Sequence, residues 1–539
     1  MQMRDKLINY IKQIDGYSLL LSFLFSTMLI ISCHVFYTPH GNSTVETTFV
    51  TDFHVLDIAG ILILIPLIYS VIKALLYMLK SVNRVVWTGE RQKRILVFMG
   101  YLIFIFVMWI PYLFSYRPGG IYSDTVDSLD MALGNKTMEN HHPVLYTLTW
   151  RFVFWLSGVF RGENVHIGLN NYTILQTLLL AGALAGFLYF LYKKGIHKLI
   201  LTFLLILFAI YPLYPYYGIS LWKDTIFSVA FFLFCLFLYD VFSNNPKDLT
   251  WKQLASYGIL SMLVMFLRNN GIYIALFYSV GIVLLCLKNR RSIAKKIGII
   301  SVSMLVVAWI IQGPLFDKAG YNIDKATESL GIPIQQTAFI LSTNGNTEGV
   351  DLEFLDTLMP LENWQALYNP VVVDTIKFDP SFDRAFLEEN YSEFVRTYLQ
   401  LVIKNPVKAV KAYLLQTMGF WNVFESDSTA YICNVHFGNA MYYMSDYFDY
   451  LFDISFHDMV APKNYLSAAI FVWGMIVTIF ICLKKRYYAG MIPLLPMFGL
   501  WITIMIATPV AFSFRYIYGI FLCVPLYVLI SLRACREEK

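Results

Sequence analysis

Charged residues are scarce in this sequence of 539 residues. Asp, Glu, Lys and Arg make up 14% of it, hydrophobic residues make up 58%, and the mean hydropathy is +0.58. Soluble globular domains carry about 25% charged residues, so this composition excludes a water-soluble fold. An integral membrane protein is the class that fits.

Cysteines are also few. The seven cysteines lie in or beside apolar runs, except Cys433, and no two of them form a C-x-x-C pair. This pattern excludes a disulfide framework and a cysteine-ligated metal site. The sequence also lacks an internal repeat of about 20–50 residues and a low-complexity tract, so a solenoid is not expected.

Apolar runs of about 20 residues recur along nearly the whole chain, and this length crosses a hydrocarbon core about 30 Å thick. The runs lack the period-2 alternation of barrel strands, so they predict helices. We therefore predict an α-helical polytopic membrane protein with about twelve membrane-spanning helices. Their expected ranges are 17–36, 56–79, 95–116, 171–191, 198–216, 221–242, 253–267, 271–287, 297–315, 465–483, 489–507 and 514–532.

The basic residues orient these helices, because Lys and Arg are held on the cytoplasmic side of a membrane. Clusters of Lys and Arg fall on alternate loops, beginning with the N-terminal segment and ending with Arg533 and Arg536. Both termini are therefore expected in the cytoplasm of a multi-pass cell-membrane protein, with residues 37–55, 117–170 and 316–463 outside. The inner loops account for the net charge of +5, so no nucleic-acid partner is indicated.

Two apolar segments need separate interpretation. The run that starts near Tyr17 has no small-residue cleavage site, so we expect it to remain as the first helix. Residues 144–160 are short and carry Arg151 among Trp and Phe, which favours a helix lying in the membrane interface. If residues 144–160 crossed the membrane, every later loop would be inverted.

Residues 316–463 form the longest polar segment and predict a small, mostly helical extracytoplasmic domain. Its aromatic clusters, AYLLQTMGFW and MYYMSDYFDYLF, either form the core of that domain or line a saccharide-binding or lipid-facing surface.

Three acids occupy the first large outer loop. Asp124, Asp127 and Asp130 follow one another at three-residue spacing, which places them near one face of a helix. Such a group suits a cation site or a general base whose pKa is raised by its acidic neighbours. The alternative is a solvated helix face. His141 and His142, further along the loop, can bind a hydroxyl, a phosphate or a metal, or have no such role.

Lys223, Arg268 and Arg515 lie at the outward ends of predicted spans, where basic residues are disfavoured. A cation at that depth needs a partner, and a lipid phosphate is a natural one. The alternatives are pairing with carboxylates such as Asp224, or extension to lipid headgroups. Three cations on the side that carries the acidic loop favour an anion site.

Several short motifs follow one another on this side, in the order: a Pro-Gly turn, an acid, Asn-His-His-Pro, Trp-Lys-Asp, Arg-Asn-Asn-Gly and a late Arg-Tyr. Over roughly residues 95–532 the chain resembles the DUF6020-type bacterial membrane proteins, within the GT-C superfamily of polyprenyl-phosphate-sugar-dependent glycosyltransferases. The resemblance implies four regions: two additional N-terminal helices in 1–94, a GT-C-like core in 95–315 with its first catalytic loop at 117–170, the extracytoplasmic domain 316–463, and C-terminal helices in 464–539.

The resemblance also implies roles for individual residues. Asp124 matches the catalytic acid and would deprotonate an acceptor hydroxyl, although Asp127 is an alternative base, and the two carboxylates could bridge a divalent cation, Mg or Mn. The donor phosphate would be bound by Lys223, Arg268 and Arg515. The residues expected to bind substrate are His141, His142 and Asp224.

The implied reaction moves a sugar, with inversion, from a polyprenyl-phosphate-linked donor in the lipid bilayer to a cell-envelope glycan or teichoic-acid-like acceptor. A transporter or flippase of a lipid-linked saccharide is the alternative, but it would place polar or broken segments near the bilayer midplane. A receptor or scaffold built on 316–463 would not need the acidic loop. Because the predicted acids and cations lie at the outer surface, the enzyme is favoured.

Overall fold

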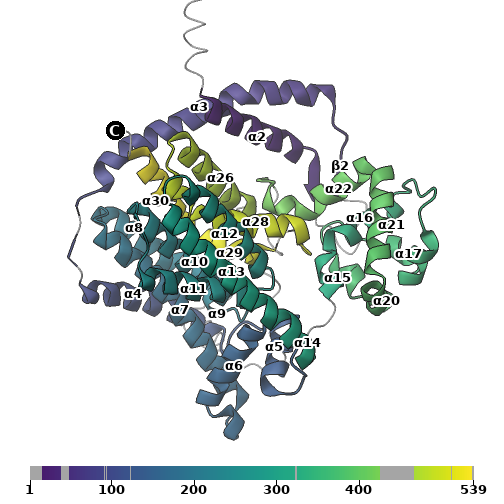
Figure 1. Ribbon diagram of the computed structural model, residues 1–539, viewed down its shortest axis with the longest axis horizontal. Helices are drawn as coiled ribbons and strands as arrows, with labels where there is room; N and C mark the ends of the chain where they lie inside the picture. The colour runs from purple at the N-terminus through teal and green to yellow at the C-terminus, as the bar shows by residue number, and fades with distance from the viewer. Residues whose placement is uncertain are drawn as a thin grey trace, which may run out of the picture.

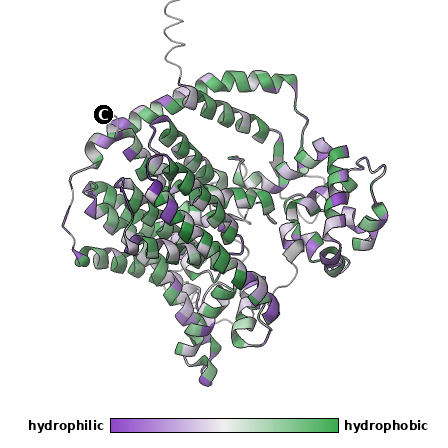
Figure 2. Ribbon diagram, in the orientation of Figure 1, coloured by the Kyte–Doolittle hydropathy of each residue, from purple (hydrophilic) through white to green (hydrophobic). Residues whose placement is uncertain are grey.

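The computed structural model shows a bundle of long helices with a smaller helical unit beside it (Figure 1). It describes residues 15–37, 48–89, 91–92, 94–121, 123–321, 325–424, 467–511 and 513–536. Figure 2 shows that the bundle helices are predominantly hydrophobic, whereas hydrophilic residues are more frequent in the helical unit.

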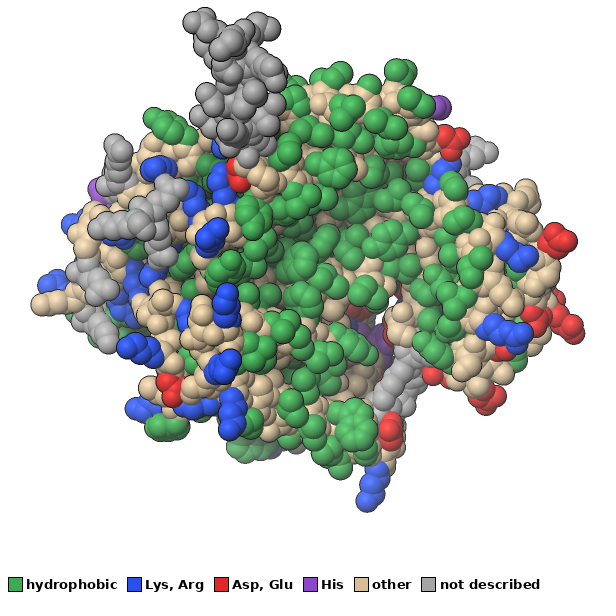
Figure 3. Space-filling view, turned by 45° about the horizontal axis from the view of Figure 1, so that its top comes forward, with side chains coloured by type: hydrophobic (Ala, Val, Ile, Leu, Met, Phe, Trp, Pro, Cys, Tyr) green, Lys and Arg blue, Asp and Glu red, His purple; other side chains and the backbone are tan. Residues whose placement is uncertain are grey.

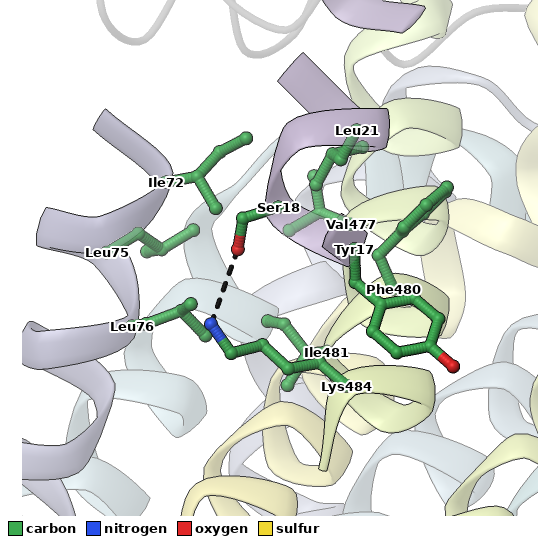
Figure 4. A pocket seen from close by; sticks show the side chains of 10 residues that line it. All are labelled: Tyr17, Ser18, Leu21, Ile72, Leu75, Leu76, Val477, Phe480, Ile481 and Lys484. Carbon is green, nitrogen blue, oxygen red and sulfur yellow. Dashed lines mark hydrogen bonds between the residues drawn. The ribbon is translucent and has the colours of Figure 1, made fainter. Parts of the chain in front are cut away.

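The N-terminal helices α2 (Gly16–Ser32) and α3 (Val55–Val86) pack against each other along the outside of the bundle (Figure 1). At one end they are joined by a short antiparallel pair of strands, β1 (Val35–Tyr37) and β2 (Thr48–Val50). Near the other end, Lys484 extends from α26 and bonds Ser18 at 3.3 Å, among apolar side chains (Figure 4).

The centre of the bundle is α10 (Lys223–Ser243), which is apolar on all sides and mostly buried. A helix that is hydrophobic all round has to be surrounded, and α10 contacts α7, α11, α28 and α29. The helices of the bundle, with their bounds, are α4 (Ile95–Ser115), α7 (Val165–Lys193), α8 (Lys198–Ile210), α9 (Leu213–Ile219), α11 (Trp251–Phe266), α12 (Gly271–Leu287), α13 (Arg291–Ile310), α26 (Ala468–Lys484), α27 (Tyr488–Met491), α28 (Leu494–Ala507), α29 (Tyr518–Leu522) and α30 (Val524–Arg536).

Several helices are long and apolar enough to cross a membrane, which is consistent with a helical membrane protein. In the described ranges, five helices are long and apolar enough, or seven if each of two bent pairs is one span. The bends lie between α8 and α9, at 47°, and before α30, at 43°. Each of the twelve expected ranges overlaps a helix, but the count of twelve is not confirmed.

Basic loops meet at one end of the bundle. Trp87 at the end of α3 pairs with Ile196 after α7, and Arg533 of α30 donates to the Ser243 carbonyl at the end of α10, at 2.6 Å. Figure 3 shows Lys and Arg side chains gathered on this side of the molecule and acidic side chains on the far edge of the helical unit. The broad face between them is hydrophobic.

Residues 144–156 form α6 (Val144–Leu156), which continues into a short 3-10 turn. Thirteen residues of helix extend only about 20 Å, less than the hydrocarbon core. Trp150 is buried, whereas Phe152 and Trp155 are exposed. One face of α6 therefore packs on the protein while aromatic side chains project from the other, which agrees with a helix that lies in the interface.

The helical unit has its own core, built around Trp364, Tyr368 and Phe394. The first of the two aromatic clusters is buried, but against β1 and the bundle rather than in the core of the unit: Trp421 packs with Val35, and Phe420 belongs to the bundle core. The second cluster lies outside the described residues. The helices of the unit are α15 (Lys325–Ser329), α16 (Gly331–Ser342), α17 (Leu352–Leu358), α18 (Leu361–Ala366), α19 (Asp374–Lys377), α20 (Arg384–Glu389), α21 (Tyr391–Lys404) and α22 (Pro406–Thr417). Before it, α14 (Phe316–Ala319) follows α13 across a π-helical turn.

Candidate active site

A tight turn brings the acidic helix α5 (Ser123–Leu133) to the start of α10. The Gly120 amide donates to the Ile219 carbonyl at 2.8 Å, and the Leu221 amide donates to the Gly120 carbonyl at 2.9 Å. Gly119 has φ +146, and a Cβ there would contact Thr173 and Leu221. A glycine is therefore required where this loop crosses α7 and α10.

Asp124 lies in the first turn of α5 and contacts two cations from distant parts of the chain. Its Oδ2 is 2.7 Å from Nη1 of Arg515 and 3.9 Å from Nζ of Lys223. Arg515 belongs to a 3-10 turn before α29, and Lys223 is the first residue of α10. Three separate elements thus converge on one carboxylate.

The pKa of Asp124 is lowered, and the expectation that its acidic neighbours raise it is wrong. Burial alone would raise this pKa, but the charges of Arg515 and Lys223 outweigh burial and hold it well below its usual range. The neighbouring acids are engaged elsewhere, because Asp127 pairs with Lys136 at 3.4 Å. Asp124 is therefore a carboxylate at neutral pH.

His142 is buried behind Lys223, with only 1% of its side chain exposed. Its Nδ1 lies 2.8 Å from Lys223 Nζ, and its Nε2 lies 3.8 Å from Asp127 Oδ2. Burial lowers the pKa of His142 to about 4, so the ring is neutral at pH 7 and can accept a hydrogen bond from the ammonium. The nearby His142 ring, followed by Lys136, lowers the pKa of Asp127 to about 2.

Arg268 and Asp224 form a second pair beneath the first. Arg268 Nη1 is 3.4 Å from Asp224 Oδ1 and donates to the Tyr516 carbonyl at 3.2 Å. The guanidinium also lies between the rings of Phe227 and Tyr516, at 5.3 and 5.4 Å. Asp224 is buried, so in this structure it contacts Arg268 rather than solvent.

His141 is close to the other predicted residues, and its backbone links two of the motifs. Asn269 Nδ2 donates to the carbonyls of Asn140 and His141, at 3.0 and 2.9 Å. The Arg-Asn-Asn-Gly turn is thereby bound to the Asn-His-His-Pro loop. Burial lowers the pKa of His141 as well.

A group of charged residues in the helical unit, which was not predicted from the sequence, borders this site. Lys377 is 1% exposed and lies 2.7 Å from Glu328 and 3.6 Å from Asp374. Burial raises the pKa of Asp374, and both Arg515 and Asp124 act on it electrostatically. No motif marks these residues, because only tertiary packing brings them to the site.

Backbone hydrogen bonds fix this part of the unit to the segment that carries Arg515. The Val373 amide donates to the Pro509 carbonyl at 3.0 Å, and the Ala511 amide donates to the Val371 carbonyl at 2.8 Å.

Two aromatic residues next to predicted cations also contribute to the site: the rings of Trp222 and Tyr516 lie 5.5 and 5.3 Å from the Arg515 guanidinium. Their positions in the Trp-Lys and Arg-Tyr motifs were the available signal.

The acids do not suit a divalent cation, so the suggested Mg or Mn bridge between Asp124 and Asp127 is not supported. Such an ion takes about six oxygen ligands, whereas Asp124 faces Arg515 and Lys223, and Asp127 faces Lys136. Within the residues that the structure describes, no group of three or more His, Cys, Asp or Glu side chains could hold a metal ion.

An apolar groove of about 300 Å³ opens between α6, α7 and the start of α10. Ile226, one turn after Lys223, lines it, and Gln176 in its wall donates to the Ser220 carbonyl at 2.7 Å. The other lining residues are Leu145, Leu148, Thr149, Phe152, Val153, Tyr172, Leu175 and Leu179. The groove is therefore close to the charged site.

Comparison with known proteins found no match to a curated protein and no match to a solved structure. A model of a family of unknown function, DUF6020, matches residues 131–539. The match includes the predicted histidines and cations, whereas Asp124 and Asp127 precede it. Because it extends over most of the sequence, the chain belongs to the DUF6020 family.

Proposed function

We propose that this protein is an inverting GT-C-type glycosyltransferase that moves a sugar from a polyprenyl-phosphate donor to a cell-envelope glycan or teichoic-acid-like acceptor. The observation that carries the proposal is the contact of Asp124 with two cations from separate elements, Arg515 and Lys223. A third cation, Arg268, pairs with the neighbouring Asp224 and acts electrostatically on Lys223. A carboxylate can accept the proton of an acceptor hydroxyl, and cations can stabilise a phosphate leaving group.

The proposed topology has twelve spans, with both termini in the cytoplasm and the site outside. Lys223 begins the 21-residue helix α10 at the site, and Ser243 ends it at the basic loops. This length corresponds to about 31 Å, the thickness of a hydrocarbon core. Since basic loops are held inside, the opposite end of α10 is assigned to the outside.

In the proposed reaction, the acceptor oxygen attacks the anomeric carbon and passes its proton to Asp124. The bond from that carbon to the phosphate oxygen breaks, and its electron pair adds a negative charge to the leaving polyprenyl phosphate. Arg515, Arg268 and Lys223 stabilise that charge through ionic hydrogen bonds. A bound phosphate competes with Asp124 for Arg515, and the pKa of Asp124 then rises toward its ordinary value, which makes it a better base.

The groove between α6 and α7 suits the apolar part of such a donor. Its lining is almost entirely aliphatic and aromatic, and Ile226 is one turn from the Lys223 cation. A polyprenyl chain in the groove would leave its phosphate at the membrane surface, where the cations lie.

A flippase of a lipid-linked saccharide remains the second candidate. It would need polar groups along a path through the membrane, whereas the cluster described above lies at the beginning of α10 and not along it. This placement favours chemistry at the surface over transport.

The test is transfer of a labelled sugar from a polyprenyl-phosphate donor to crude cell-envelope acceptor by the purified protein in detergent. The wild type should transfer, and Asp124→Asn should not, while both elute and melt alike. Equal transfer by both would remove Asp124 as the base. Donor binding without transfer by either would favour the flippase.

A further inference from the structure

A line of exposed apolar side chains crosses the corner between α21 and α22. Leu399 and Ile403 lie four residues apart near the end of α21, and Val407 and Val410 lie three apart at the start of α22. These spacings place each pair on one face of its helix. Ile403 and Val407 are 76% and 65% exposed. We call these four side chains the apolar corner.

The apolar corner lies beside the end of a membrane-spanning helix. Lys411 of α22 forms an ion pair with Asp52 at 2.7 Å, and Asp52 lies three residues before the start of α3. Val55 and Leu56, at the start of α3, are also exposed. The apolar surface of α3, which is one of the helices suited to crossing a membrane, is thus continued by the helical unit.

Helix geometry gives the distance of each valine from Lys411 along α22. Val410 directly precedes Lys411 in α22. Val407 lies four residues before Lys411, about 6 Å from it along the helix axis. The headgroup layer of one leaflet is about 5–8 Å thick. If Asp52 marks the edge of the hydrocarbon and α22 runs outward from Lys411, Val410 and Val407 lie no further out than the thickness of the headgroup layer.

The charge around the apolar corner agrees with a lipid surface. Lys404 is exposed beside Ile403, and Lys408 lies between the two valines in sequence. Apolar side chains flanked by lysines are typical of elements that insert into an anionic interface. The acidic side chains of the unit gather on the edge away from the bundle (Figure 3).

We propose that the apolar corner inserts into the headgroup layer of the leaflet that it faces and binds anionic phospholipid there. The helical unit is then held on the membrane surface by its own lipid contact as well as by its bonds to the bundle. This surface is separate from the charged site, so the proposal does not depend on the reaction there.

The experiment is photocrosslinking of the full-length protein in nanodiscs that contain phosphatidylglycerol. The photoreactive amino acid p-benzoylphenylalanine replaces Val407 in one sample and Val410 in another. Glu353 of α17, on the side of the unit away from the bundle (Figure 1), is the matched negative position, and Leu96 of α4 is the lipid-facing positive position. Adducts are identified by intact mass.

Phosphatidylglycerol adducts at positions 407 and 410, at least fivefold above position 353, are expected. Adducts at position 96 without any at 407 or 410 would overturn the proposal. So would crosslinks from 407 or 410 to residues 425–466 of the same chain, because that segment would then cover the apolar corner. Replacement of phosphatidylglycerol by phosphatidylcholine should reduce the adducts, and an unchanged yield would contradict the part assigned to Lys404.

Discussion

At the scale of single residues, the site is a connected series of polar contacts. Lys223 has only donors, so the His142 Nδ1 at 2.8 Å must be the acceptor, and the remaining proton lies on Nε2, which faces Asp127. A carboxylate that orients an imidazole fixes its tautomer. His142 therefore positions Lys223, which in turn faces Asp124.

Substitution of His142 separates a positioning role from a packing role. An asparagine can place its side-chain oxygen near the position of Nδ1, whereas a glutamine cannot. We expect His142→Ala and His142→Gln to raise the KM for the donor about tenfold, equivalent to about 1.4 kcal/mol. His142→Asn should stay within about threefold of the wild type.

His166→Asn, at an exposed histidine that begins α7, is the control and should leave the KM unchanged. Equal KM values for the alanine, glutamine and asparagine variants would show that the Nδ1 acceptor has no role in donor binding.

His142 also predicts a dependence of stability on pH. Burial lowers its pKa to about 4, whereas an unfolded histidine titrates near 6.5. Between these values the unfolded chain binds more protons, so the contribution is complete above about pH 6.5 and is lost as the pH falls through 4. The shift corresponds to roughly 3 kcal/mol. The melting temperature should fall between pH 7 and pH 4 in the wild type and fall less in His142→Asn; parallel curves would contradict this.

The sequence predicted part of the site. Lys223, Arg268 and Arg515 were found because basic residues at outward span ends need an explanation. The structure places Arg515 and Lys223 at Asp124, and Arg268 at Asp224, the residue after Lys223. Asp374 could not be found, because an acid in a polar segment is unremarkable until the chain folds. The direction of the Asp124 pKa was missed because spacing reveals neighbours along a helix but not cations from other elements.

At the scale of elements, the turn at Gly119 sets the distance between α5 and α10. Its φ of +146 lies in a region that side chains disfavour, and an added Cβ would lie 2.9 Å from the Leu221 side chain. Gly134 also has positive φ, +88, but an added Cβ would meet nothing within 4 Å. The two glycines therefore differ in crowding and share backbone strain.

Gly119→Ala should destabilise the protein by about 2–4 kcal/mol, and Gly134→Ala by about 1 kcal/mol. Gly119→Ala should also reduce sugar transfer, since α5 would move away from Lys223. Melting temperatures in detergent and transfer rates for both variants check this. Equal losses in the two variants would mean that crowding at Gly119 has no effect.

Apolar length predicted where helices lie but not how they bend. The ranges 198–216 and 514–532 were each expected as one span, and each contains a sharp bend. Hydropathy averages over a window, whereas the bend before α9 depends on the local Tyr211-Pro212 backbone. The boundaries of α10 and α12 were predicted closely, because charged or glycine-containing turns mark both ends.

At the scale of the whole molecule, the two ends of the bundle differ in charge, and this predicts how the protein lies in the membrane. Cysteines introduced at Glu353 in the helical unit and at Arg290 before α13 should face opposite sides. In a background with Cys33 and Cys433 replaced by serine, a membrane-impermeant maleimide should label Glu353→Cys in intact cells. Arg290→Cys should be labelled only after the cells are permeabilised, and the reverse pattern would invert the topology.

The backbone bonds between residues 371–373 and 509–511 restrict the conformation of the segment that precedes Arg515. A chain held in this way has already lost its conformational entropy during folding. An anion that meets Arg515 therefore does not have to order the segment at each encounter, and more of the contact energy is expressed as affinity. In this sense the helical unit preorganises a residue that it does not contain.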